Sequence, residues 1–258
     1  MLAVGDPKQL PASVTSRRAV EFGLDKSLLD RLMFGCGEEH MMLDVQYRMS
    51  PAISAFPSTT FYNSQLRNGQ NVISPSYKGE ISIIGPQYTF INVNGSGESR
   101  ASSGSYYNAA EANAVLRLVQ IIQDASRDVK MSNWASNQKI RIITFYSGQV
   151  RAIKDLLRSR GLTNVMCATV DSSQGSEADI VIVSFVRSNG NSSNSEGKHN
   201  VGFLNDDRRI NVALTRAKFK LFCLGDANTL LNAGAQTITD LVNDAKSRNV
   251  LFDQDILK

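Results

Sequence analysis

Four polar segments of the sequence contain residue types that could bind a nucleotide and act on its phosphates. The first is residues 5–11 (GDPKQLP), in which Gly5, Asp6 and Gln9 follow an apolar run at residues 1–4. If that run is a buried strand, these residues stand at its carboxyl end, where α/β proteins place their ligands. Taken alone, the segment also fits an ordinary loop that contains prolines.

The second segment is residues 46–49 (QYRM), which is followed by Ser50 and Pro51. Proline suits the first turn of a helix, and serine suits the position that caps it. Tyr47 and Arg48 are therefore expected just ahead of a helix. On its own, such a pair is also explained by an ordinary surface contact.

The third segment is residues 169–177 (TVDSSQGSE), a polar loop between two apolar runs. Gly175 would let the backbone approach a ligand closely, because glycine has no side chain to obstruct it. Polar residues gathered at a strand end indicate a binding site, although they also serve simply to fill a loop.

The fourth segment runs from residues 202–205 (GFLN) through residues 208–217 (RRINVALTRA). If this stretch is helical, Arg209 and Arg216 lie seven residues apart and project from one side. Two guanidinium groups on one side could hold an anion. The alternative is a solvated basic face of a helix.

Between these segments, short β-branched runs alternate with amphipathic stretches, a pattern typical of an α/β fold with a parallel sheet covered by helices on both faces. Ser147 could cap one of the helices, and Gly161 would follow its end. Polar stretches at residues 94–105 and 190–200 are expected to be loops. The strands are expected at residues 1–4, 88–93, 139–145, 165–170, 179–186 and 220–225. The helices are expected at residues 26–33, 51–62, 108–129, 147–160, 206–217 and 237–248.

The composition sets limits on the class of protein. With 258 residues, 42% hydrophobic content and a net charge of +4, the chain can form a core and suits an anionic partner. Cys36, Cys167 and Cys223 lie far apart, which indicates buried, reduced thiols, no metal site and a cytoplasmic or nuclear location. No apolar run is long enough to span a membrane.

The four segments in this order, with residues 143–149 (ITFYSGQ) between the second and third, resemble motifs III to VI of superfamily 1 helicases. QYRM, the Q-G-x-E loop and N-V-A-L-T-R-A resemble the branch that contains the nonsense-mediated-decay helicase and senataxin. The resemblance runs from residue 1 to about residue 233. It implies that residues 36–258 form the second RecA-like domain of a motor, with a P-loop NTPase-like parallel sheet sandwiched by helices. Residues 1–35 would be the end of the first such domain, with the motif III strand and a linker.

The resemblance also implies roles for single residues around ATP, which would lie between two RecA-like domains. Gln9 matches the glutamine that senses the γ-phosphate, and Arg48 and Arg216 match the arginines that reach it. Tyr47 matches the residue that stacks on the adenine, and Glu177 matches the one that binds the ribose. The remaining candidates for nucleotide binding are Gly5, Asp6, Gly175 and Arg209.

Single-stranded nucleic acid is the second ligand that the resemblance implies, with RNA favoured over DNA and movement from 5′ to 3′. Small hydroxyl groups would bond the phosphates and read little sequence. Gln149 and Gln174 are hypothesised to link this surface to ATP. The residues matching the strand contacts are Thr144, Tyr146, Thr169 and Ser172.

Two departures from the helicase pattern limit what this chain would do alone. It contains no G-x-x-x-x-G-K-[ST] segment and no Asp-Glu pair. The phosphate cradle and the Mg²⁺ ligands are therefore expected in a first RecA-like domain, supplied in cis or in trans. The chain is expected to be part of an ATP-dependent helicase and nearly inactive alone. A true start at Met1 would favour a split motor, or else a non-catalytic module that binds single-stranded nucleic acid or a protein.

Overall fold

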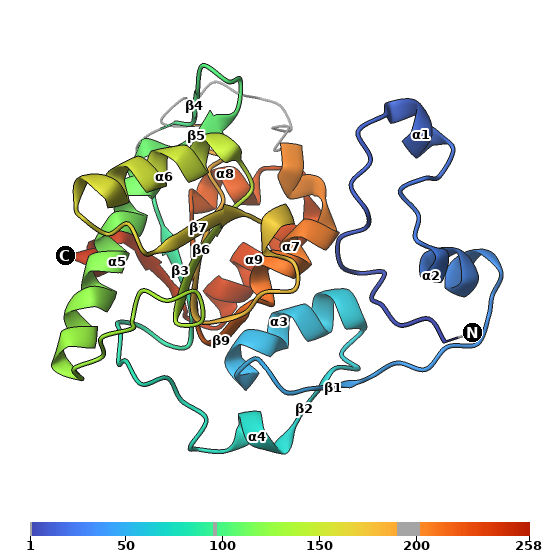
Figure 1. The fold of residues 1–258 in the computed structure, drawn as a ribbon, viewed down its shortest axis with the longest axis horizontal. Helices are drawn as coiled ribbons and strands as arrows, with labels where there is room; N and C mark the ends of the chain where they lie inside the picture. Colours follow the sequence, from blue (N-terminus) through green and yellow to red (C-terminus); the bar gives the residue numbers. More distant parts are fainter. Residues whose placement is uncertain (1, 95–96, 190–201) are drawn as a thin grey trace.

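A six-stranded parallel sheet forms the centre of the computed structural model, which describes residues 2–94, 97–189 and 202–258. The strand order is β10-β3-β9-β8-β6-β7, and every neighbouring pair is parallel (Figure 1). This confirms the predicted α/β class. The strands are β3 Tyr88–Asn92, β6 Ile140–Thr144, β7 Met166–Thr169, β8 Ala178–Ser184, β9 Ala217–Gly225 and β10 Leu251–Asp253.

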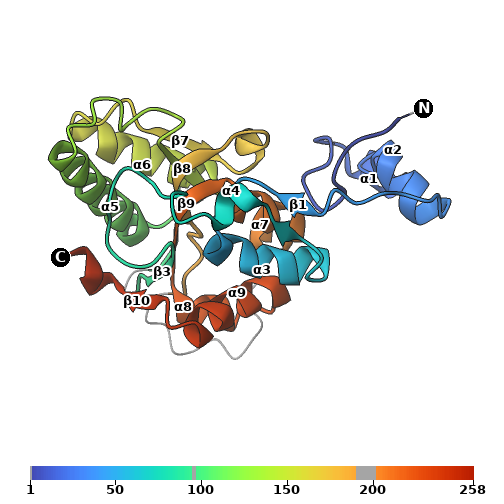
Figure 2. The same cartoon turned by 90° about the horizontal axis from the view of Figure 1, so that it is seen from below.

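The side chains of each strand alternate between two apolar cores, one on each face of the sheet. In β6, Ile143 contributes to one core and Ile142 to the other, and both are fully buried. Helices therefore cover both faces, as predicted (Figure 2). The helices of the first core are α3 Pro51–Tyr62, α7 Asp207–Leu214, α8 Ala227–Leu231 and α9 Gln236–Ser247. Those of the second core are α5 Ala109–Asp128 and α6 Ser147–Ser159.

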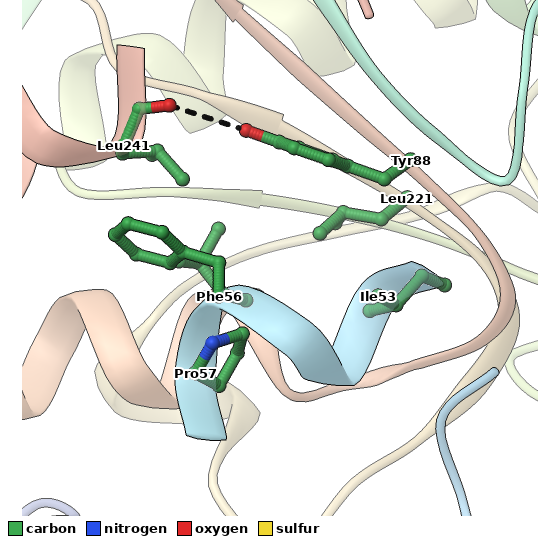
Figure 3. Close-up of a pocket in the computed structure, with 7 residues that line it drawn as sticks. Ile53, Phe56, Pro57, Tyr88, Leu221 and Leu241 are labelled. Atoms are coloured by element: carbon green, nitrogen blue, oxygen red, sulfur yellow. Dashed lines mark hydrogen bonds between the residues drawn. The ribbon is translucent and has the colours of Figure 1, made fainter. Parts of the chain in front are cut away.

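Helix α3, which directly follows the QYRM segment, is anchored by apolar packing on the sheet. Ile53 and Phe56 of α3 lie against Tyr88 of β3 and Leu221 of β9, and all four are buried (Figure 3). The Tyr88 hydroxyl donates to the carbonyl oxygen of Leu241 in α9 at 3.5 Å. This packing fixes the start of α3, and with it the position of the QYRM segment.

Residues 2–44 form an arm at one side of the sheet, as Figures 1 and 2 both show. Its helical turns are short, and the predicted helix at residues 26–33 is a three-residue α-helix followed by a π-helix. The strand predicted at residues 1–4 is wrong: Met1 lies outside the described residues, and residues 2–4 form no strand. A strand needs a neighbour to pair with, and no described strand lies beside these residues. The arm contains α1 Arg17–Glu21, α2 Leu28–Asp30 and η1 Arg31–Gly35.

The helix predicted at residues 206–217 ends early, at Leu214, because β9 begins at Ala217. Helix α6 begins at Ser147 as predicted, but its capping position is Tyr146 and no side chain caps it. Ser50 does occupy the capping position of α3, without a hydrogen bond from its side chain. Element types were therefore predicted more accurately than their ends.

The remaining elements are short. The loop predicted at residues 94–105 contains β4, which pairs with β5, while residues 95–96 lie outside the described residues. The loop predicted at residues 190–200 lies wholly outside them. In the described part of the chain, no helix is both long and apolar enough to cross a membrane. These short elements are β1 Val45–Gln46, β2 Arg67–Asn68, α4 Gln70–Ile73, β4 Ser99–Arg100, β5 Tyr106–Tyr107, η2 Asp171–Ser173, η3 Gly202–Asn205 and η4 Gln254–Leu257.

The cysteines follow the prediction only in part. Cys167 and Cys223 are buried free thiols, and burial raises the pKa of Cys167 to about 12. Cys36 is also free but is exposed, so the prediction that it is buried was wrong. It lies directly after η1 in the arm, which supplies no core to cover it.

Candidate active site

Arg48 and Arg216 converge on Thr215, which lies between α7 and β9. Arg48 donates from Nη1 to the Thr215 carbonyl oxygen at 3.1 Å, and Arg216 donates from Nη2 to the Thr215 hydroxyl at 2.8 Å. Arg48 comes from the segment before α3, more than 160 residues away in the chain. The fold therefore brings the two arginines together, although Arg216 lies beyond the end of α7 and does not share a helix with Arg209.

The guanidinium group of Arg216 is buried, with 2% of the residue exposed. It donates from Nε to the Val212 carbonyl oxygen at 3.0 Å and from Nη2 to Gln9 Oε1 at 3.4 Å. Burial, followed by the nearby charge of Arg48, lowers the pKa of Arg216 to about 10, so it stays cationic at neutral pH. Among the described residues no carboxylate forms an ion pair with it. A buried cation without a counterion is suited to attract an anionic ligand.

The loop at residues 5–11 is held against the sheet domain by polar contacts. Asp6 accepts from Gln9 Nε2 at 3.0 Å and from the Tyr62 hydroxyl at 2.7 Å. Asn211 of α7 donates to the carbonyl oxygen of Lys8 at 2.8 Å. Burial raises the pKa of Tyr62, so its hydroxyl keeps its proton and remains a donor. These bonds place Gln9 next to Arg216.

Tyr47 has one side of its ring supported and the rest open. The residue is 64% exposed, and a Cβ on Gly69 would stand 2.4 Å from the ring. The Tyr47 carbonyl oxygen accepts from Asn71 Nδ2 at 2.9 Å. Glycine at position 69 therefore lets the ring lie on the backbone. Sequence reasoning missed Gly69, which no motif marks.

Glu177 is bound by two cations. Its Oε2 accepts from Arg48 Nε at 2.7 Å, and its Oε1 accepts from Lys218 Nζ at 2.8 Å. These bonds, first Lys218 and then Arg48, lower the pKa of the carboxyl group. The nearby Gly175 has φ +76° with open space around it, a backbone conformation that other residues rarely adopt. Sequence reasoning missed Lys218, although it follows Arg216 by only two residues.

The carboxyl edge of the sheet aligns three hydroxyl side chains. In register, Thr144 of β6 lies between Thr169 of β7 and Ser184 of β8. Thr144 is fully buried and Tyr146 is 4% exposed, so in this conformation neither offers its hydroxyl to a nucleic-acid strand. The reason is that Thr144 ends a central strand whose two faces are covered by packed elements, while the Tyr146 ring packs against Tyr106 and Phe203. Thr169 is half-buried and Ser172 is exposed, so these two predicted contacts remain accessible.

Two other predicted residues lie away from the arginine pair. Arg209 is held by the carboxylates of Asp171 at 3.0 Å and Asp206 at 2.8 Å, and its guanidinium group lies over the Phe203 ring. Gly5 is exposed, and a Cβ there would meet the Leu29 side chain at 3.0 Å. The arrangement therefore does not bring Arg209 to Thr215.

The two glutamines hypothesised to link the surface to ATP differ. Gln174 donates to the Leu10 carbonyl oxygen at 3.2 Å, so it does contact the loop at residues 5–11. Gln149 is fully buried and bonds Asn108 and Ser184 instead. These hydrogen bonds join α6 to β8 and to the residue before α5, and Gln149 does not reach the arginines.

A buried carboxyl group, Glu111 of α5, lies beneath the carboxyl edge and was missed. It accepts from the Ser184 hydroxyl at 2.6 Å and from the Val186 backbone at 2.9 Å. Burial is the main cause that raises its pKa to about 8. Only the fold reveals it, because in the sequence it is one glutamate in an amphipathic helix.

Comparison with known proteins identifies relatives along nearly the whole chain. A family model described as an AAA domain matches residues 24–228. Helicase sen1 of Schizosaccharomyces pombe is 34% identical over 97% of this chain and 14% of its own length. The probable helicase senataxin of Homo sapiens is 36% identical over 98% of this chain and 9% of its own length. The regulator of nonsense transcripts 1 homolog of Drosophila melanogaster is 36% identical over 98% of this chain and 21% of its own length.

The chain thus spans between 9% and 21% of the length of these three relatives. Among solved structures, the C-terminal domain of a possible DNA helicase from Lactobacillus plantarum WCFS1 matches with a TM-score of 0.41 and 15% identity. That match covers 81% of this chain and 99% of that chain. The family match and the curated relatives show that this chain belongs to the AAA-domain helicases of superfamily 1, in the branch of senataxin and the regulators of nonsense transcripts.

Proposed function

We propose that this chain is the second motor domain of an ATP-dependent helicase, and that it supplies the arginines that act on the γ-phosphate. The observation that carries the proposal is the meeting of Arg48, Arg216 and Gln9 from three distant segments. An ordered cluster of two cations and an amide has no evident use in a domain that only binds a partner. It is what phosphoryl transfer needs, because negative charge must be stabilised on the transferred group.

Each residue of the cluster has a distinct task in this proposal. Arg216 and Arg48 provide fixed, planar charge for the γ-phosphate oxygens. Gln9 can donate through its amide nitrogen and orient an attacking water through its amide oxygen. The buried position of Arg216 strengthens its attraction for phosphate, because little water screens it.

The nucleoside part of ATP is assigned to the neighbouring surface. The open side of the Tyr47 ring would stack on the base, and Glu177 would accept from the ribose hydroxyls. Gly175 and Asp6 would shape the site, Gly175 through its open backbone and Asp6 by orienting Gln9. Arg209 and Gly5 remain proposals that the geometry does not support.

A first RecA-like domain, in cis or in trans, would complete the motor. It would contribute the phosphate cradle and the ligands of Mg²⁺, which offsets phosphate charge when bound. We assign residues 1–35 to the end of that domain and residues 36–258 to the second domain. Ten of the fourteen exposed large hydrophobic side chains in the described residues lie within residues 2–43, which supports a missing apolar neighbour.

Single-stranded nucleic acid, with RNA favoured over DNA, is the proposed second ligand. Thr169 and Ser172 are accessible at the carboxyl edge, and their hydroxyl oxygens lie 3.2 Å apart. Such groups would bond phosphates and leave the bases unread. Thr144 and Tyr146 would take part only after the edge of the sheet rearranged. The relatives are named as helicases and as a regulator of nonsense transcripts, and we propose a nuclear or cytoplasmic location for this protein.

The alternative is a non-catalytic module that binds nucleic acid or a protein. The test is Arg216→Lys in this chain joined to a first RecA-like domain of the same branch. We expect kcat for ATP hydrolysis to fall by about 10³-fold or more, while single-stranded RNA still binds. Lysine keeps the charge but loses the planar fork.

Arg158→Lys is the matched control, because Arg158 is an exposed arginine of α6 that pairs only with Asp155 in the described structure. It should leave kcat unchanged. Thermal unfolding of both variants, followed by Trp134 fluorescence, checks that the fold survives. If the joined protein binds RNA but Arg216→Lys leaves hydrolysis at the unmodified rate, Arg216 is not a catalytic residue. That result would favour the non-catalytic binding module.

A further inference from the structure

The carboxylate of Glu177 is shared between a candidate catalytic arginine and a lysine that no motif includes. Arg48 Nε and Lys218 Nζ each bond a different oxygen, at 2.7 Å and 2.8 Å. The three side chains are between 29% and 41% exposed, so a ligand can reach them. Arg48, Lys218 and Glu177 together carry a net charge of +1, because two cations share one carboxylate.

Backbone bonds hold the parts of this group in place. Ser50, at the start of α3, donates from its backbone nitrogen to the Lys218 carbonyl oxygen at 2.8 Å. Ala178, next to Glu177, donates in the same way to the Arg216 carbonyl oxygen at 3.0 Å. The Tyr77 hydroxyl also donates to the Arg48 carbonyl oxygen. Partners can therefore be exchanged by rotating side chains, without moving the main chain.

The proposed function gives Arg48 and Glu177 tasks that cannot both be met while they are bonded. Glu177 would accept from ribose hydroxyls, and Arg48 would donate to the γ-phosphate. A guanidinium group whose Nε is held by the ribose-binding carboxylate cannot use that donor on a phosphate. Of the donors of Arg48, Nη2 makes no hydrogen bond to the described residues, so only part of the group is free in this conformation.

We propose that the ribose hydroxyls displace Arg48 from Glu177, and that Lys218 is the positioning residue that holds the carboxylate during this exchange. The inference rests on the proposed function. Lys218 keeps one oxygen of Glu177 occupied, so the carboxylate stays ionised and oriented while its other oxygen turns to the ribose. Arg48 is thereby released toward the phosphates, and recognition of ribose becomes coupled to placement of the arginine.

The charges explain why Arg48 bonds Glu177 in this conformation. Moving it toward Arg216 would bring two cations together in a partly buried place, and the charge of Arg48 already contributes to the lowered pKa of Arg216. Two like charges at short range repel unless an anion lies between them. Phosphate supplies that anion. Ribose alone can displace Arg48 from Glu177, and movement of the displaced Arg48 closer to Arg216 requires phosphate as well.

The test uses the 258-residue chain and two probes that lack phosphate, adenosine and 2′,3′-dideoxyadenosine. Side-chain NMR would follow the Arg48 Nε–H signal, with the Tyr47 ring signals reporting occupancy. We expect adenosine to bind about ten-fold more tightly, because hydrogen bonds to a charged acceptor are strong. Adenosine should shift the Arg48 signal toward that of Glu177→Gln, whereas dideoxyadenosine should leave it in place.

Lys218→Met tests the positioning role, and Lys154→Met, at an exposed lysine of α6, is its matched control. In Lys218→Met, the preference for adenosine should fall to about two-fold or less, while both nucleosides still perturb Tyr47. In Lys154→Met, the ten-fold preference should persist.

Three results would overturn the inference. Adenosine could perturb Tyr47 while the Arg48 signal stays fixed, which would mean that no exchange occurs. Lys218→Met could retain the full preference, which would remove Lys218 from the mechanism. If neither nucleoside perturbs Tyr47 even at saturating solubility, the proposed nucleotide surface itself fails together with the exchange.

Discussion

The arm at residues 2–44 and the sheet domain that follows it differ in how far their side chains are buried, although both contain many apolar residues. No residue from 2 to 48 is buried, whereas the sheet domain encloses two cores with fully buried members such as Phe90 and Phe222. The difference shows that apolar residues form a core only where elements lie on both sides of them. The arm has one such neighbour at most, and most of its large apolar side chains stay exposed.

The arm is attached to the sheet domain by polar contacts and by Leu10, which packs against the first core. Asp6 accepts from Tyr62, the Lys8 carbonyl oxygen accepts from Asn211, and Gln9 accepts from Arg216. Hydrogen bonds depend on direction, so they orient Gln9 even though they bury little surface. In this way a part of the chain without a buried residue contributes to the candidate active site.

The largest effect should come from truncating a core side chain and comparing it with a matched residue of the arm. Phe222→Ala removes a fully buried ring from β9 and should lower the free energy of unfolding by about 3 to 5 kcal/mol. Phe34→Ala removes a ring that is 63% exposed and should change it by less than about 0.5 kcal/mol. Urea unfolding followed by Trp134 fluorescence measures both.

This pair of variants tests whether the arm and the sheet domain differ in packing as described. A cost for Phe34→Ala similar to that for Phe222→Ala would mean that the arm packs as part of the core in solution. An unchanged free energy for Phe222→Ala would mean that the second core is not closed around β9.

An intermediate effect is expected from the buried Glu111, which has no counterpart among the exposed side chains of the arm. Its folded-state pKa of about 8 lies above the ordinary value of 4.5, so the folded protein binds this proton more tightly. Its contribution to stability is complete below pH 4.5, falls as pH rises, and is lost above about pH 8. The slope between these limits should reach about 1.4 kcal/mol per pH unit.

Glu111→Gln should remove this dependence, because the amide cannot ionise and its oxygen can still accept from Ser184. Urea unfolding at a series of pH values between 5 and 8 (roughly the titration window) compares the variant with the unmodified chain. Identical slopes would show that Glu111 does not titrate in this range.

The smallest effect concerns two glycines, one in each region. Gly69→Ala would put a methyl group against the Tyr47 ring and should weaken ATP binding to the joined motor by about ten-fold, the worth of about 1.4 kcal/mol. Gly35→Ala in the arm meets nothing within 4 Å and should leave binding unchanged. Titration with a fluorescent ATP analogue measures both affinities. Equal affinities would show that the ring does not need its support on Gly69.

Much of the fold could be predicted because the sheet strands and long helices carry strong local patterns. Five strands were correctly placed between residues 88 and 225, and β3, β6 and β8 among them are rich in β-branched or aromatic residues. Helices α5 and α6 have clear apolar faces. The strand at residues 1–4 had the same apolar pattern and failed. A strand exists only through pairing, and pairing is not encoded in the run itself.

The candidate site could be predicted in part. The motif order placed Gln9, Arg48 and Arg216 together, and the structure brings these three to one place. It could not show that Thr144 is buried, because burial depends on which elements pack over the faces of the sheet around β6. It could not show that Arg209 is held by Asp171, a residue 38 positions away.

The motifs in their order were sufficient to indicate the family, and the local periodicity was sufficient to predict the parallel sheet, since each depends on short segments of the chain. Contacts between distant segments decided the rest. These contacts include the ion pair between Lys218 and Glu177 and the approach of Gly69 to the Tyr47 ring. The burial of Glu111 also depends on how the elements pack, because distance and burial are properties of the assembled fold.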